Sequence, residues 1–195
     1  LAAADTPYEQ VLMCDIRDVF FQLDPFQELA VSEGLGVALE PEHLTIGACE
    51  IHARWLSDEC LTYQQERVLD SIANKSRSCA GTTIGTHEAV AAYCEIMQQE
   101  ARRTVHAVSA EQARAFAGRI TTFDGQQWWG WCNDQAMHNA LLWSGRLEER
   151  FPVTLYSAEK SPLATVGTMK TLRMNAEGEL LAGCAVGNSN EEDEE

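Results

Sequence analysis

Basic residues are scarce in this chain. Its 195 residues include 14 Lys and Arg against 30 Asp and Glu, which gives a formal net charge of −16. Because nucleic-acid binding relies on lysine and arginine side chains that meet phosphates, this balance argues against a nucleic-acid partner. Part of the negative charge lies in residues 186–195, which we expect to form a disordered acidic tail. Residues 1–185 suit a single domain with a hydrophobic core.

Long apolar runs are also missing. No segment approaches the roughly 20 apolar residues of a transmembrane helix, so we expect no membrane span in this chain. The first five residues, LAAAD, lack the basic start and apolar centre of a signal peptide. The segment GTTIG at 81–85 has neither the lysine nor the spacing of a P-loop, which leaves hydrolysis of nucleoside triphosphates unsupported.

The seven cysteines show no spacing typical of a zinc site, because no close pair is matched by a second one. A disulfide between Cys49 and Cys60 could staple the short segment between them and would indicate an oxidising compartment. Buried free thiols are the alternative, and spacing alone does not decide. Asn74-Lys75-Ser76 matches the acceptor pattern of N-glycosylation, so the chain is a candidate glycoprotein, although this short pattern also recurs by chance.

Apolar runs and helical periodicities alternate along the chain. Strands are expected at 11–14, 35–39 and 153–156. One helix is expected where Thr62 and Gln65 form a capping box, and others from about residue 86, from Ser109 and after Asn133. Residues 81–85 are predicted to be a glycine-bounded loop before the second helix. The alternation predicts an α/β fold whose sheet is flanked by helices.

The most informative feature is an apolar strand that ends in carboxylates. The run VLMC at 11–14 leads directly to Asp15 and Asp18. Carboxyl ends of parallel strands border the ligand crevice in α/β folds, and acids there suit a hard divalent cation. The same acids could instead cap turns or pair with Arg17, whose guanidinium also suits a phosphate. Asp24 is expected to cap its own turn.

Two later segments offer weaker signals. The glycine-bounded segment 81–85 could present backbone amides to an anion or a sugar, or be a plain strand-to-helix turn. Asp134 and His138 lie four residues apart, so both could face one cleft, or Asp134 could be a helix-start acid favoured by the dipole. The tryptophans at 128, 129 and 131 are expected in the core or in a cleft wall, where one could stack on a sugar.

Taken together, these motifs resemble a family of nucleotide-sugar glycosyltransferases found in plants, algae and some bacteria. The resemblance extends over about residues 8–175. It implies a GT-A-like sandwich with a mixed sheet flanked by helices, and a secretory-pathway location, most specifically the Golgi lumen. The matching segments are CDIRDVFFQLDPF (14–26), IGAC (46–49), Trp55, Cys60, IANK (72–75), SCAGTTIG (78–85) and DQAMHN (134–139).

The resemblance also implies roles for individual residues. The cofactors would be Mn²⁺ or Mg²⁺ and a nucleotide-sugar donor, and the acceptor would be a glycan or a protein. In an inverting reaction the candidate base, Asp134, would take the proton of the acceptor hydroxyl. The resemblance implies that Asp15 and Asp18 bind the metal and that Asp134 and Gln135 are catalytic. The residues that it implies for donor binding are Arg17, Gly81, Thr82 and Thr83.

Two features of that family are not found in this sequence. GT-A proteins usually have a further strand–helix unit before the acidic motif, whereas only a short segment precedes Val11. We therefore expect a truncated domain, or one that borrows this layer from a protein partner. A late histidine ligand is also missing from residues 180–185, LLAGCA. A noncatalytic structural or assembly subunit is the alternative function, because an incomplete sheet exposes an edge. A metal-dependent sugar-phosphate hydrolase is a third option.

Overall fold

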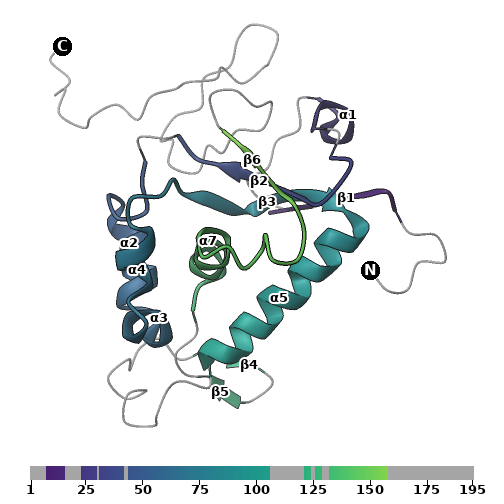
Figure 1. Cartoon of the computed structure of the whole chain (residues 1–195). Coiled ribbons are helices and arrows are strands. Elements are labelled where there is room, and N and C mark those ends of the chain that lie inside the picture. The colour runs from purple at the N-terminus through teal and green to yellow at the C-terminus, as the bar shows by residue number, and fades with distance from the viewer. Residues whose placement is uncertain are drawn as a thin grey trace, which may run out of the picture.

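A mixed four-stranded sheet lies over helices in the computed structural model, which describes residues 8–15, 23–29, 31–41, 44–105, 121–123, 126–128 and 132–157 (Figure 1). The predicted α/β architecture, with a mixed sheet flanked by helices, is therefore confirmed at this level. Several sequence predictions lie outside the described residues: Arg17, Asp18, the helix from Ser109, the tryptophans at 129 and 131, and the acidic tail.

The order of the main sheet is β1-β3-β2-β6. Its longest strand, β3, runs antiparallel to both β1 and β2, and β6 runs parallel to β2. The carboxyl ends of β1, β2 and β6 therefore lie at the same end of the sheet as the start of β3. All three predicted strands are confirmed. The strands are β1 (Gln10–Cys14), β2 (Leu35–Leu39), β3 (Ser78–Thr86) and β6 (Val153–Tyr156).

The glycine-bounded loop expected at 81–85 is wrong, because these residues lie inside β3. Their β-branched threonines and isoleucine suit a strand. Both glycines lie where another group comes too close for a side chain. A Cβ atom on Gly81 would lie 2.2 Å from Oδ2 of Asp15, and one on Gly85 would lie 2.6 Å from the carbonyl oxygen of Gly34. The glycines therefore permit close packing across the sheet instead of forming a turn.

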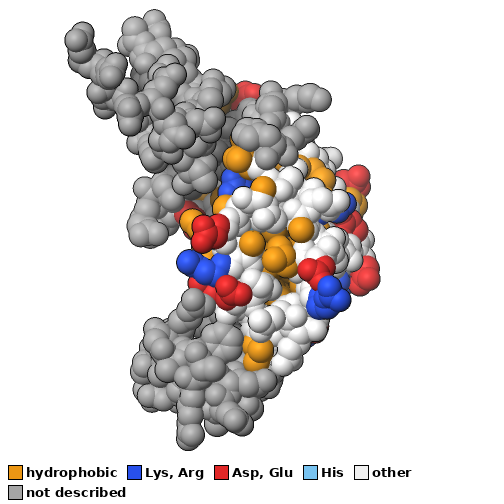
Figure 2. Space-filling view, turned by 90° about the vertical axis from the view of Figure 1, so that its left-hand side faces the viewer, with side chains coloured by type: hydrophobic (Ala, Val, Ile, Leu, Met, Phe, Trp, Pro, Cys, Tyr) orange, Lys and Arg blue, Asp and Glu red, His pale blue; other side chains and the backbone are white. Residues whose placement is uncertain are grey.

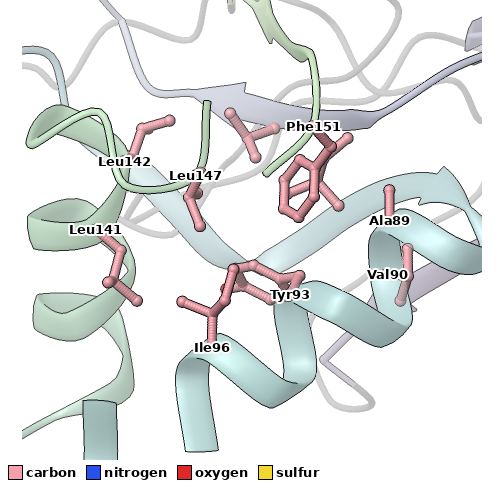
Figure 3. Close-up of a cluster of buried hydrophobic side chains, with 10 residues drawn as sticks. Ala89, Val90, Tyr93, Ile96, Leu141, Leu142, Leu147 and Phe151 are labelled. Carbon is pink, nitrogen blue, oxygen red and sulfur yellow. The ribbon is translucent and has the colours of Figure 1, made fainter. Parts of the chain in front are cut away.

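Two long helices, α5 (His87–Val105) and α7 (Asp134–Trp143), pack against one face of this sheet. Their starts confirm the sequence prediction. Thr86 Oγ1 accepts a hydrogen bond from the Ala89 amide at 3.2 Å, and Asn133 Oδ1 accepts one from the Gln135 amide at 2.8 Å. The main core lies between these helices and the sheet (Figure 3), and consists of Leu35, Val37, Ala89, Val90, Tyr93, Ile96, Leu141, Leu142, Leu147 and Phe151.

A second core joins α7 to three shorter helices, α2 (Glu50–Ser57), α3 (Leu61–Gln65) and α4 (Val68–Ile72). The capping box predicted at Thr62 is wrong: α3 begins at Leu61 with Cys60 as its N-cap, and the Thr62 hydroxyl donates to the Thr104 carbonyl at 3.2 Å. Arg67 then adopts a left-handed conformation with φ of 55° and separates α3 from α4. The apolar side of α4 packs against this core.

Of the two alternatives for Cys49 and Cys60, the disulfide between them is wrong. Cys60 forms a disulfide with Cys132, and Cys49 is a free thiol. Ten residues separate Cys49 from Cys60, and the first eight of them form α2. At 1.5 Å per residue a helix of that length spans about 12 Å, well beyond the roughly 7 Å that a disulfide allows between Cα atoms. The bridge joins two segments of the second core, 72 residues apart.

A buried carboxylate links α3, α5 and the turn that follows α7. Glu100 is 1% exposed and accepts hydrogen bonds from the Tyr63 hydroxyl at 2.8 Å, from Arg103 Nε at 3.1 Å and from Arg146 Nη1 at 2.6 Å. Burial by itself would raise the pKa of Glu100, but these three donors lower it to about 2. On the face of the molecule drawn in Figure 2, acidic and basic side chains also lie beside one another at the surface.

The remaining described elements are α1 (Pro25–Leu29) and a two-stranded sheet of β4 (Thr121–Phe123) and β5 (Gln126–Trp128). Asp24 Oδ1 accepts a hydrogen bond from the Phe26 amide at 2.9 Å, which confirms its predicted role as a turn cap. Within the described residues, every helix is too short or too polar to cross a membrane.

Candidate functional site

The candidate site lies at the end of the sheet where β1 finishes and β3 starts. Asp15 directly follows β1, and its amide donates to the Gly81 carbonyl at 3.0 Å. The Asp15 carboxylate lies against the Cα atom of Gly81, since a Cβ there would be 2.2 Å from Oδ2 and 2.6 Å from Cγ. The structure therefore brings together two residues that are far apart in the sequence and that the resemblance assigned to the metal and the donor.

The carboxylate of Asp15 is accessible. Asp15 is exposed, and its carboxylate forms no ion pair with any residue that the structure describes. An exposed carboxylate free of such pairing keeps its oxygens available to a hard cation. Within the described ranges no three His, Cys, Asp or Glu residues are placed to hold a metal ion together. Because Asp18 lies outside those ranges, the two-aspartate metal site stays a prediction.

Cys79, a free and half-buried thiol, lies two residues before Gly81 in β3. Burial raises the pKa of Cys79, the Gly81 amide and the Thr82 hydroxyl lower it in part, and the charges of Glu40 and Asp15 add weaker upward effects. The Thr82 hydroxyl donates to Cys79 Sγ at 4.0 Å. Cys79 is therefore a neutral thiol at pH 7 and suits a site wall better than a nucleophile, which would need the thiolate.

Gln135 connects α7 to the start of β3. Its Oε1 accepts a hydrogen bond from the Ala80 amide at 2.8 Å, and its Nε2 donates to the Ser78 carbonyl. One turn further along α7, Asn139 makes a similar pair of bonds with Ser78, both at 2.9 Å. The side-chain amide of Gln135 is thus engaged with backbone groups of β3. In this arrangement it positions the strand that carries Gly81.

Asp134 is exposed in the first turn of α7. Its Oδ1 accepts a hydrogen bond from the Gln135 amide at 2.8 Å, which matches the helix-start role considered above. Burial raises the pKa of Tyr93, and the negative charge of Asp134 is the next largest contribution. Asp134 therefore lies close enough to the buried Tyr93 to raise its pKa, while Asp134 itself is exposed to solvent.

The expectation that His138 and Asp134 share a cleft is wrong, because His138 is completely buried. Ser78 Oγ donates to the Ala38 carbonyl at 3.0 Å, so it accepts from His138 Nε2 at 2.9 Å. This tautomer leaves His138 Nδ1 to accept from the Tyr93 hydroxyl at 2.7 Å. Burial lowers the pKa of His138 to about 4, so the ring is neutral at pH 7. The chain of bonds fixes β3 between β2 and the two long helices.

The two threonines predicted to line the donor site differ in exposure. Thr82 is half-buried, whereas Thr83 is completely buried. Only Thr82 of this pair has surface to offer a ligand. Sequence reasoning missed the structural contribution of Ser78, Tyr93 and Asn139. The detectable signal was the presence of Gln135, His138 and Asn139 among the apolar residues that follow Asp134 in this helix.

Comparison of this chain with protein-family models, with curated proteins and with solved structures found no match. The assignment of a function therefore depends on the motifs and on the geometry of the described residues.

Proposed function

We propose that this chain is a metal-dependent glycosyltransferase domain of the secretory pathway, with a GT-A-like fold. It would transfer a sugar from a nucleotide-sugar donor to a glycan or protein acceptor. The observation that supports this most is the exposed carboxylate of Asp15, which lies at the end of β1 against Gly81. This carboxylate lies at the end of the sheet where β1, β2 and β6, which run in the same direction, all finish. In α/β proteins, ligands bind at the carboxyl ends of such strands.

The described residues fit a divalent cation in part. Asp15 has the hard oxygen donors that Mn²⁺ and Mg²⁺ prefer, and Asp18 would be the second carboxylate. When bound, the ion would neutralise charge on the diphosphate of the donor. Arg17 would add a guanidinium that suits phosphate oxygens. The half-buried Thr82 would offer its surface to the donor, while the bare Cα of Gly81 makes room for the Asp15 carboxylate itself.

Asp134 is the proposed general base. Its exposed carboxylate would take the proton of the acceptor hydroxyl as the new carbon–oxygen bond forms and the bond between the sugar and the diphosphate breaks. Gln135 follows it in the chain but has its side-chain amide committed to β3. We therefore assign Gln135 to positioning of β3 instead of contact with the acceptor.

A noncatalytic assembly subunit is the second candidate. Among the described strands, β6 pairs on one side only, with β2, and its Leu155 is 43% exposed. A one-sided strand with an exposed leucine is a surface that another chain can cover. Sedimentation of the pure chain would show a concentration-dependent dimer if β6 is such an interface. Loss of that dimer on substitution Leu155→Lys would support it, and a monomer at all concentrations would count against it.

The experiment that tests the enzyme proposal is calorimetric titration of the full chain with Mn²⁺ and a panel of nucleotide sugars. We expect metal-dependent donor binding that Asp15→Asn weakens at least tenfold. Glu33→Gln is the matched control, because Glu33 is exposed and precedes β2 at the opposite end of the sheet from Asp15. Equal binding by the Asp15 variant and the wild type would remove the proposed role of Asp15.

A further inference from the structure

The turn that follows α4 is held to the protein by its backbone, and the side chains of Asn74 and Lys75 are exposed. The Gly47 amide donates to the Ala73 carbonyl at 2.8 Å, and the Ile46 amide donates to the Lys75 carbonyl at 2.9 Å. Trp143 Nε1 donates to the Ser76 carbonyl at 2.9 Å. The residues on both sides of position 74 are thereby fixed to neighbouring segments.

Asn74 lies at the exposed tip of this turn. Its side-chain amide makes no hydrogen bond with any described residue, and neither does the hydroxyl of Ser76. These two groups, the amide and the hydroxyl two residues later, define the acceptor pattern of N-glycosylation. No other asparagine in the sequence is followed two residues later by Ser or Thr. The one acceptor pattern of the chain thus lies on an ordered, exposed turn with both of its polar groups available.

The disulfide between Cys60 and Cys132 is an independent observation that points to the same chemistry. Cys60 is 0% and Cys132 is 1% exposed, so the bridge is part of the second core. Structural disulfides form in oxidising compartments such as the lumen of the endoplasmic reticulum. N-glycosylation is a modification of secreted proteins that takes place along the same route. The residue pattern, its exposure and the bridge therefore agree.

We propose that Asn74 is an N-glycosylation site. Asn74 Nδ2 would form a bond to the anomeric carbon of an oligosaccharide carried on a polyprenyl diphosphate. The bond between that carbon and the diphosphate oxygen breaks, and the diphosphate leaves with its electron pair. The amide nitrogen loses one proton to a base of the transferring enzyme. The exposed turn accommodates the product without displacing core residues, because Asn74 is exposed.

The test is secretion of the full chain, behind a cleavable leader, from a eukaryotic cell line. We compare the wild type with Asn74→Gln, Ser76→Ala and Ser76→Thr before and after treatment with an endoglycosidase. We expect the enzyme to lower the mass of the wild type and of Ser76→Thr by one glycan. The Asn74→Gln and Ser76→Ala variants should have the lower mass from the start. Peptide mass spectrometry should find the glycan remnant on residue 74.

A second measurement keeps a negative result informative. Mass spectrometry of secreted, unreduced protein reports whether Cys60 and Cys132 are joined, and thereby whether the chain folded in an oxidising compartment. Secreted protein that contains this disulfide but has the mass of unmodified Asn74→Gln would overturn the proposal. A wild-type glycan found at any residue other than Asn74 would overturn it equally.

Discussion

Replacing Glu100 with glutamine should remove much of the acid sensitivity of this fold. Its hydrogen bonds from Arg103, Arg146 and Tyr63 outweigh burial and lower the pKa of Glu100 from the ordinary 4.5 to about 2. Because the folded-state pKa lies below the unfolded one, this stabilisation is fully present above about pH 4.5 and is lost as the pH falls towards 2. At about 1.4 kcal/mol per pKa unit, the difference corresponds to about 3 kcal/mol.

Urea denaturation at a series of pH values measures this directly. Between about pH 6 and pH 2, the wild type should lose about 3 kcal/mol more unfolding free energy than Glu100→Gln. At pH 7 the variant should be less stable than the wild type, since Arg103 and Arg146 lose their shared carboxylate. Glu95→Gln, an exposed position on the same helix, serves as the control and should follow the wild-type curve. Parallel curves for Glu100→Gln and the wild type would refute the reasoning.

Three further predictions concern the site and the cores. Gly81→Ala should displace the Asp15 carboxylate by about 1 Å and weaken Mn²⁺ binding about tenfold or more in calorimetry, and unchanged affinity would contradict the contact. Ser78→Ala should lower the unfolding free energy by about 2 kcal/mol, because it leaves the buried His138 N–H without its acceptor. A loss below about 0.5 kcal/mol in urea denaturation would be evidence against the hydrogen bonds that join Ser78, His138 and Tyr93. Cys132→Ser should cost about 4 kcal/mol for a 72-residue separation, and a reductant should destabilise the wild type but leave this variant unchanged.

Hydrophobic patterning was sufficient to predict three of the four strands of the main sheet and the start of both long helices. Residues 35–39 form a fully buried strand, and such runs are recognisable because apolar residues are continuous and bounded by turn residues. The segment 81–85 was harder, since glycine is typical of turns and the local sequence does not reveal a neighbour from another strand. The carboxylate of Asp15 is that neighbour, and it is 66 residues away from Gly81 in the sequence.

Long-range pairing limited the site and disulfide predictions in the same way. Cys60 pairs with Cys132 because α3 and the start of α7 share a core, which no local spacing encodes. Asp134 and His138 lie four residues apart, so the sequence allowed both to face one cleft or Asp134 to be a helix-start acid. Their burial differs because α7 packs His138 against Ser78 and Tyr93, whereas Asp134 lies at the exposed first turn. Chemical roles at this sheet end stay predictions for Asp18 and Arg17.

The most direct test of the central claim is paramagnetic broadening of backbone amide NMR signals by Mn²⁺ in the full chain. If Asp15 contributes to a metal site at the end of β1, sub-stoichiometric Mn²⁺ should broaden the amide signals of Asp15, Gly81 and Thr82 first, with Glu33 unaffected. The broadening should disappear in Asp15→Asn. Broadening that is uniform over the acidic surface, or that persists in this variant, would contradict a metal-dependent site at this position.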